Sequence, residues 1–329
     1  MKKIKILLLC SSMLLLAACS SGGGSNSSTI ESSAVTSEVI TTSEEGTRTL
    51  PYSLSQLQAK FGSFKITPDT STGATIPTYD SETNCYLINV ASEKSTYTLK
   101  GYFNGSIRII NGNALTSYKK VKLELEGACR VSTNSTPAIE YAVDSKNVDI
   151  KSNNNSTNYV IATDSSDAIR SYNNIVFGGK GTLNIWTFFG HGIRASEEVR
   201  FHSSPTINIS SGHDGIHCEN FNGYDGTIDG TDYEVFTGTL NFSDIVSQAF
   251  DCESSSFTGS FYLPKGSINI NNAESVFKTD VSIIVNGSVV ATNISGDPVV
   301  KNPDYSGTLT ITVGGTFKVN GSDFTQKTL

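Results

Sequence analysis

Ala168-Ile169-Arg170-Ser171, Gly192-Ile193-Arg194-Ala195, Gly215-Ile216-His217-Cys218 and Ala249-Phe250-Asp251-Cys252 repeat one phrase: a small residue, an apolar anchor, a polar residue and a small residue. Ser275-Val276 repeats it more weakly, and successive anchors lie 24, 23, 34 and 26 residues apart. Between them, runs such as 181–185 and 206–209 alternate apolar and polar residues, which is typical of strands with one buried face. Units of about 23 residues are too small to bury that face alone, so the pattern predicts stacked coils of a parallel β-helix.

The strand pattern extends on both sides of this stretch. Ile139 fits the anchor column 30 residues before Ile169, and Val299 lies 23 residues after Val276. Strands are predicted at 96–102, 106–110, 121–126, 147–151, 159–162, 175–178, 181–186, 199–202, 206–209, 238–242, 260–263, 267–270, 281–285, 288–292, 307–312 and 315–319. We therefore expect an all-β chain, with a single-stranded parallel β-helix (a solenoid) of roughly ten coils over 95–329.

Residues 1–18 have the features of a lipoprotein signal peptide. Lysines within residues 2–5 precede the apolar run 6–16, and Leu16-Ala17-Ala18 leads into Cys19. This phrase resembles a bacterial lipoprotein signal, which implies cleavage before Cys19 and lipid on its thiol. An ordinary secretory signal with an incidental cysteine is the alternative. Because two or more acyl chains anchor stably, we expect the mature chain on the extracellular face of a bacterial membrane, attached only through its lipid.

Two segments separate this signal from the solenoid. Residues 19–47 are rich in Ser, Thr, Gly and Glu, a composition that predicts a disordered tether. Residues 48–94 include a possible amphipathic helix at 54–61. We interpret them as an N-terminal cap or entry segment, because an uncovered solenoid end exposes apolar core and strand edges.

Composition narrows the possible partners. The net charge of −7 and the pI near 5.2 argue against nucleic acid and suit divalent cations. We expect a monomer. Cys218 and Cys252 share a column and should lie about 4.8 Å apart, which permits either a disulfide or two buried thiols. The pairing of Cys85 and Cys129 is open.

The phrase 213–219, His-Asp-Gly-Ile-His-Cys-Glu, resembles the Asp-Gly-Ile-His-Ala-Asp phrase of a family of bacterial surface-anchored carbohydrate-binding β-helix proteins. Residues 190–194, 199–201 and 206–209 resemble the family's preceding coil, and 96–101, 121–127 and 137–140 resemble its opening coils. The resemblance implies a right-handed β-helix distantly like pectate lyases. It also implies calcium-associated binding of polysaccharide of the polygalacturonate and cellulose type, without established catalysis. His191 stands where the family prefers an acidic residue, and Phe250-Asp251 replaces an Ile-Glu pair; both departures weaken the expected metal sites.

The column that follows the anchors is charged: it reads Glu140, Arg170, Arg194, His217 and Asp251. It should point outward if the anchors point inward. Arg170, Arg194 and His217 are therefore candidate contacts for an anionic ligand such as a uronate chain, because guanidinium groups match carboxylate geometry. A solvated ladder balanced by neighbouring carboxylates is the alternative.

Carboxylates flank the same anchors, and Ca²⁺ prefers six to eight oxygen ligands. The candidate calcium ligands are Asp164, Asp167, Asp214, Glu219, Asp251 and Glu253. Turn chemistry of aspartate before glycine is the alternative. All four histidines lie within the 27 residues from His191 to His217, which leaves a transition-metal site as a further hypothesis.

The longer spacing between Ile216 and Phe250 places an insert at roughly 220–237. Inserts in solenoids often form a binding wall, so Tyr224 and Tyr233 are candidate ligand contacts, with a plain surface hairpin as the alternative. Trp186 is expected to face outward, where its ring could stack on sugar or pack under the insert or the N-terminal segment.

These patterns favour a protein that binds a polysaccharide outside the cell, with an acidic, pectin-type polymer as the expected ligand, without catalysis. The sequence shows no nucleophile elbow, P-loop or dinucleotide fingerprint. A pectate-lyase-like polysaccharide lyase and a structural or adhesive surface protein are the alternatives.

Overall fold

The computed structural model describes residues 39–40, 48–90, 94–111, 120–133, 135–143, 147–164, 166–223, 227–228, 231–254, 259–325 and 327–329, which belong to one compact unit, 37–329. The predicted signal peptide and Cys19 lie outside these residues. In the predicted tether, β1 (Val39–Ile40) pairs antiparallel with β2 (Arg48–Thr49), which belongs to the predicted cap or entry segment. None of the described helices is long and apolar enough to cross a membrane.

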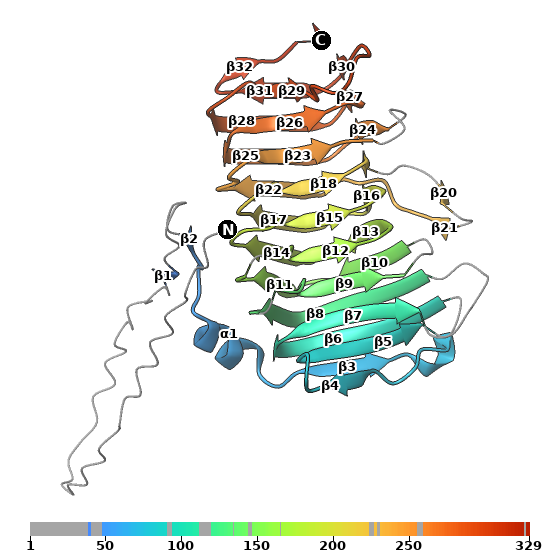
Figure 1. Ribbon diagram of the computed structural model, residues 1–329. Coiled ribbons are helices and arrows are strands. Elements are labelled where there is room, and N and C mark those ends of the chain that lie inside the picture. The colour runs from blue at the N-terminus through green and yellow to red at the C-terminus, as the bar shows by residue number, and fades with distance from the viewer. Residues whose placement is uncertain are drawn as a thin grey trace, which may run out of the picture. The chain divides into compact units, whose positions relative to one another are not determined.

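Stacked parallel strands form the body of the unit, which is therefore a β-solenoid (Figure 1). The first stack contains β10 (Asn147–Ser152), β13 (Asn174–Gly179), β16 (Glu198–Phe201), β19 (Asn220–Gly223), β24 (Ser260–Leu263), β27 (Ser282–Val285) and β30 (Thr310–Val313). The second contains β11 (Thr157–Ala162), β14 (Thr182–Thr187), β17 (Thr206–Ser210), β22 (Thr239–Ser243), β25 (Ser267–Ala273), β28 (Ser288–Ile294) and β31 (Thr316–Val319). The long strands β6 (Lys94–Asn104) and β8 (Lys120–Ser132) join the two stacks, because β8 pairs with both β10 and β11.

The third stack is built from the anchor phrases. It contains β5 (Cys85–Val90), β7 (Ser106–Asn111), β9 (Ile139–Ala142), β12 (Ile169–Ser171), β15 (Ile193–Ala195), β18 (Ile216–Cys218), β23 (Gln248–Cys252), β26 (Ser275–Thr279) and β29 (Val299–Lys301). The predicted strands match the first two stacks closely except for β19, which occupies the start of the predicted insert at 220–237, and they omit most of the third stack. Several of its strands have only three residues, which is too short for alternation to reveal them.

The anchors form one buried ladder of residues in register: Ile107, Ile139, Ile169, Ile193, Ile216, Phe250, Phe277 and Val299. The prediction that Val276 is an anchor is wrong by one position, since Phe250 pairs with Phe277. Both Val276 and Phe277 are apolar and buried, so composition alone could not choose between them. The correction places Lys278 directly after Asp251 in the charged column.

Aromatic and amide ladders hold successive coils together. In the core, the rings of Phe221 and Phe261 stack with centroids 4.3 Å apart. On the second stack, Nδ2 of Asn208 donates to Oδ1 of Asn184, and Nδ2 of Asn241 donates to Oδ1 of Asn208, both at 2.8 Å. Each coil therefore repeats the outward and inward side-chain positions of the one before it.

The cysteines Cys218 and Cys252 are neighbours in register, as the shared column predicts. Their sulfur atoms are 3.9 Å apart and unbonded, and both side chains are buried. In this structure they are two thiols of the core rather than a disulfide.

The N-terminal segment packs on the outside of the long strands. Helix α1 (Leu54–Phe61) lies against β6 and β8, and Ser53 and Gln56 form a capping box at its start. The ends of the stacks are bordered by short antiparallel strands: β3 (Lys65–Pro68) on β6, β4 (Thr78–Asp80) on β5, β32 (Ser322–Asp323) on β31 and β33 (Lys327–Thr328) on β30. A 3-10 turn (Thr70–Thr72) and the hairpin β20 (Thr227–Ile228) with β21 (Thr231–Asp232) complete the described elements.

Candidate functional site

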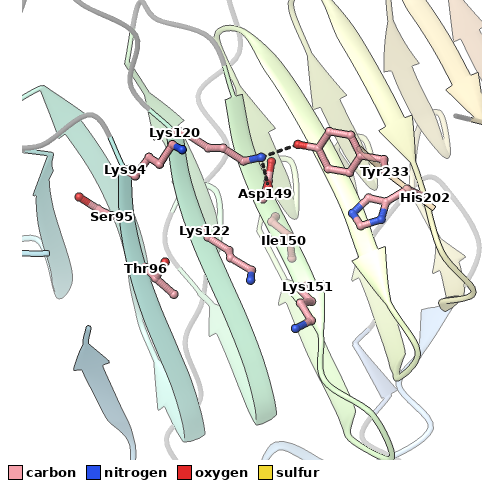
Figure 2. A pocket seen from close by; sticks show the side chains of 10 residues that line it. All are labelled: Lys94, Ser95, Thr96, Lys120, Lys122, Asp149, Ile150, Lys151, His202 and Tyr233. Carbon is pink, nitrogen blue, oxygen red and sulfur yellow. Dashed lines mark hydrogen bonds and ion pairs between the residues drawn. The ribbon is translucent and has the colours of Figure 1, made fainter. Parts of the chain in front are cut away.

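A pocket of about 380 Å³ opens on the outer face of β6, β8 and β10 (Figure 2). We call it the lysine pocket. Its lining residues are Lys94, Ser95, Thr96, Lys120, Lys122, Asp149, Ile150, Lys151, His202 and Tyr233. The strand register brings these side chains together: Lys94 of β6 pairs with Lys120 of β8, and Lys122 of β8 pairs with Asp149 of β10.

The charge of the lysine pocket is positive. Lys120 Nζ lies 2.8 Å from Asp149 Oδ2. Lys122 and Lys151 share Glu124, with Nζ–Oε1 distances of 2.8 and 3.3 Å. Lys122 and Lys151 therefore share a single carboxylate, which leaves this pair with a net positive charge. Lys94 and Lys120 occupy directly opposed strand positions, where like charges repel.

The pKa values of His202 and Lys120 reflect the burial of these side chains and the charges around them. Burial, and then the charge of Lys120, lowers the pKa of His202 to about 4. For Lys120, burial acts to lower the pKa, but the charge of Asp149 and its hydrogen bond raise it above the ordinary lysine value. The ammonium of Lys120 therefore stays protonated, and His202 stays neutral, at physiological pH.

Tyr233 and His202 form the aromatic side of the pocket. Their ring centroids are 4.7 Å apart, and Lys120 Nζ lies 4.8 Å from the Tyr233 centroid and donates to its hydroxyl. The imidazole lies over Gly178, where an added Cβ would sit 2.1 Å from Nε2. A side chain at 178 would therefore displace the ring that borders the pocket.

Of the predicted ligand contacts, only Tyr233 lies in the lysine pocket. Tyr224 lies outside the described residues. Trp186 packs against the apolar cluster that includes Leu50 and Leu57 of the N-terminal segment. Of the two alternatives for this ring, packing under the N-terminal segment is the one observed. None of the four lysines was expected from the sequence. The available signal was Lys120-Val121-Lys122, which puts two lysines on one strand face.

The predicted column is formed as expected, since Glu140, Arg170, Arg194, His217 and Asp251 are consecutive in register. Its cations differ in their partners. Arg170 Nε is 4.0 Å from Asp167 Oδ2, and its guanidinium lies 4.9 Å from the Tyr172 centroid. Arg194 has no ion-pair partner among the described residues.

Arg194 and His217 line a second pocket of about 400 Å³, which we call the acidic pocket. Its carboxylates are those of Glu219, Glu253, Asp280 and Asp304. Four carboxylates against Arg194 and His217 make this pocket less suited to an anionic ligand than the lysine pocket.

The predicted calcium ligands do not converge on one point. Glu219 and Glu253 line the acidic pocket. Asp164 lies 3.2 Å from the hydroxyl of Ser135, and Asp167 accepts from the backbone N–H of His191. The other two aspartates already have close partners: Asp214 Oδ2 lies 3.1 Å from His191 Nδ1 and 2.9 Å from His213 Nδ1, and Asp251 Oδ2 is 3.2 Å from Lys278 Nζ.

The stacked coils define a β-solenoid whose outer surface carries the lysine pocket and the acidic pocket. The model of the carbohydrate-binding domain-containing protein family matches residues 84–328 of the chain, which therefore belongs to this family. Membership supports a carbohydrate-binding role. No curated protein and no solved structure matches the chain.

Proposed function

We propose that this chain is a lipid-anchored, extracellular polysaccharide-binding protein that holds acidic sugar units in the lysine pocket without cleaving them. The observation that supports this most is the convergence of four lysines on one pocket, in which Lys122 and Lys151 share the single carboxylate of Glu124. A uronate carboxylate is the acidic group of pectin-type polymers, and charge-assisted hydrogen bonds from ammonium groups suit it.

The aromatic side of the pocket fits a sugar ring. The side chain of Tyr233 is half-buried and lies beside Lys120. If the carboxylate of a uronate contacts the ammonium groups, the sugar ring of that uronate lies near the Tyr233 ring. Aromatic rings contribute large contact area at low entropic cost. The repeat of outward positions from coil to coil extends this surface beyond one sugar, which suits a polymer.

Binding without cleavage follows from the protonation of the groups in the pocket. β-Elimination from a uronate needs a base that takes the proton next to the carboxylate. The lowered pKa of His202 makes it a weak base. Burial and the charge of Asp149 raise the pKa of Tyr233, which opposes a phenolate. The raised pKa of Lys120 keeps that amine protonated.

The competing ligand site is the column of Arg170, Arg194 and His217, and the competing activity is that of a polysaccharide lyase. Both are tested with polygalacturonate. We expect retention of the full chain on the immobilised polymer, and no accumulation of unsaturated uronate by absorbance, with Ca²⁺ present and at mildly alkaline pH. Steady formation of the unsaturated product would show that the chain is a polysaccharide lyase and not only a binding protein.

Ca²⁺ is proposed for the acidic pocket rather than for all six predicted ligands. Glu219, Glu253, Asp280 and Asp304 supply carboxylate oxygens there, and Asn302 adds an amide oxygen, which is the donor chemistry that Ca²⁺ prefers. Bound Ca²⁺ would offset the negative charge of these groups.

Three further features belong to the proposal. The solenoid is right-handed, with roughly ten coils, as the repeat length and the family resemblance suggest. Cys19 holds the chain at the membrane surface through lipid, and residues between this anchor and the solenoid give it reach. The chain acts as a monomer.

A further inference from the structure

Three histidines surround one buried carboxylate where the coils of β15 and β18 meet. We call His191, His213, Asp214 and His217 the histidine cluster. Asp214 Oδ2 lies 3.1 Å from His191 Nδ1, 2.9 Å from His213 Nδ1 and 3.8 Å from His217 Nδ1. The side chain of Asp214 has no exposed surface, whereas those of His191 and His217 are 13% and 26% exposed.

The spacing of these atoms matches a metal coordination sphere. One ligand atom each from His191, Asp214 and His217 lies within 4.8 Å of the other two. Zinc bonds of about 2.0–2.2 Å in tetrahedral geometry set the ligand atoms roughly 3.4 Å apart. A single ion therefore reaches all three groups with only small rotations of the rings.

Two ring nitrogens in the cluster lack a well-aligned hydrogen bond within the described part of the chain. Nδ1 of His191 and Nδ1 of His217 are buried and make no well-aligned hydrogen bond among the described residues; they lie 3.1 and 3.8 Å from Asp214 Oδ2, and His217 Nδ1 lies 3.6 Å from Asp251 Oδ2. Buried polar atoms in proteins are nearly always satisfied. The two rings also lie close together, with centroids 4.8 Å apart, so two protonated imidazoles would repel. A shared cation would satisfy both nitrogens and keep the rings neutral.

The carboxylate is held from its other side. Oδ1 of Asp214 accepts from the backbone N–H of Gln248 at 3.1 Å, and Oδ2 accepts from His213 when that imidazole carries its proton on Nδ1. Partners of this kind orient metal ligands and raise their affinity. The backbone is fixed as well, because the N–H of Gly192 donates to the carbonyl of Asp214 in the next coil.

We propose that His191, Asp214 and His217 form a binding site for a divalent transition-metal ion of the zinc type. Two imidazole nitrogens and one carboxylate leave a fourth position for water or another ligand. Nitrogen donors distinguish this site from one for Ca²⁺, which takes six to eight oxygens. The site is separate from the lysine pocket, and it does not depend on the identity of the sugar.

The test is metal binding by the full chain, purified without a histidine tag and freed of metal. Calorimetry with Zn²⁺ should give one ion per chain, and Co²⁺ should produce the intense visible bands of a tetrahedral ion. Millimolar Ca²⁺ should not displace Co²⁺. His191→Gln and His217→Gln should each weaken binding by at least about tenfold, whereas His202→Gln removes an imidazole elsewhere and should leave metal binding unchanged.

Melting of the metal-free variants checks that they fold. The proposal is overturned if the wild-type chain gives no Co²⁺ bands, if Ca²⁺ displaces Co²⁺ readily, or if folded His191→Gln and His217→Gln bind as wild type does. The first two outcomes are measured on the wild-type chain, so they test the proposal even if a variant fails to fold.

Discussion

Removing two lysines from the lysine pocket should weaken the binding of polygalacturonate. Lys122 and Lys151 are the suitable pair, because both are more than a third exposed and both share Glu124. Lys120 is less suitable, because its loss would leave the nearly buried carboxylate of Asp149 without its ion-pair partner. Lys122→Gln with Lys151→Gln cancels the positive excess and leaves Asp149 paired.

The size of the effect follows from the exposure of these groups. An exposed ion pair contributes roughly 1 kcal/mol at most, so the loss of two should cost about 2 kcal/mol, or roughly 30-fold in Kd. Affinity electrophoresis in gels that contain polygalacturonate measures this change. Binding should also weaken in 1 M salt, where the Debye length falls to about 3 Å.

A matched control separates the pocket from the overall charge. Lys180→Gln with Lys265→Gln removes the same charge from two exposed lysines outside the pocket and should change Kd by less than about twofold. The reasoning is refuted if both double variants lose affinity equally, or if Lys122→Gln with Lys151→Gln binds as wild type does. Loss of binding in Arg170→Ala with Arg194→Ala instead would move the site to the predicted column.

Three other outcomes are expected. Phe250→Ala should lower the free energy of unfolding in urea by about 3–5 kcal/mol, because the ring is buried and lies 4.8 to 5.4 Å from the rings of Phe221, Phe242, Phe261 and Phe277; a loss no larger than that of Phe189→Ala, a change at an exposed ring, would contradict this packing. Ca²⁺ should raise the melting temperature of the metal-free chain by mass action, and Glu219→Gln with Asp304→Asn should remove the rise; identical melts with and without Ca²⁺ would count against the acidic pocket as a calcium site. Cys19→Ser should release the chain from the membrane fraction, and unchanged retention would exclude lipid on Cys19 as the anchor.

Much of the fold could be read from period-two alternation, because every coil must bury one face of each strand. That requirement acts on residues such as Ile207 and Ile209, whose alternation with polar neighbours is visible in the chain. Alternation gives no signal where two adjacent residues are both buried, as at Val276 and Phe277. The predicted anchor in this coil is therefore wrong by one residue. Short strands such as β12 were visible only as a repeated phrase.

The candidate site was less predictable, because it depends on which outward positions meet between coils. The column of Arg170, Arg194 and His217 could be predicted, since its members follow consecutive anchors at regular spacing. The lysine pocket required the pairing of β6 with β8, together with an insert residue, Tyr233, that returns to strands more than a hundred positions earlier. Neither relation leaves a periodic signal.

We propose that the lysine pocket recognises the carboxylates of an acidic polysaccharide. The most direct measurement compares the full chain on polygalacturonate and on the same polymer with its carboxylates methyl-esterified, at equal chain length and salt. The chain should bind the acidic polymer with an affinity that falls as salt rises, and it should bind the ester at least about tenfold more weakly. Equal affinity for both polymers, or binding to neither, would contradict recognition of the carboxylates by the lysine pocket.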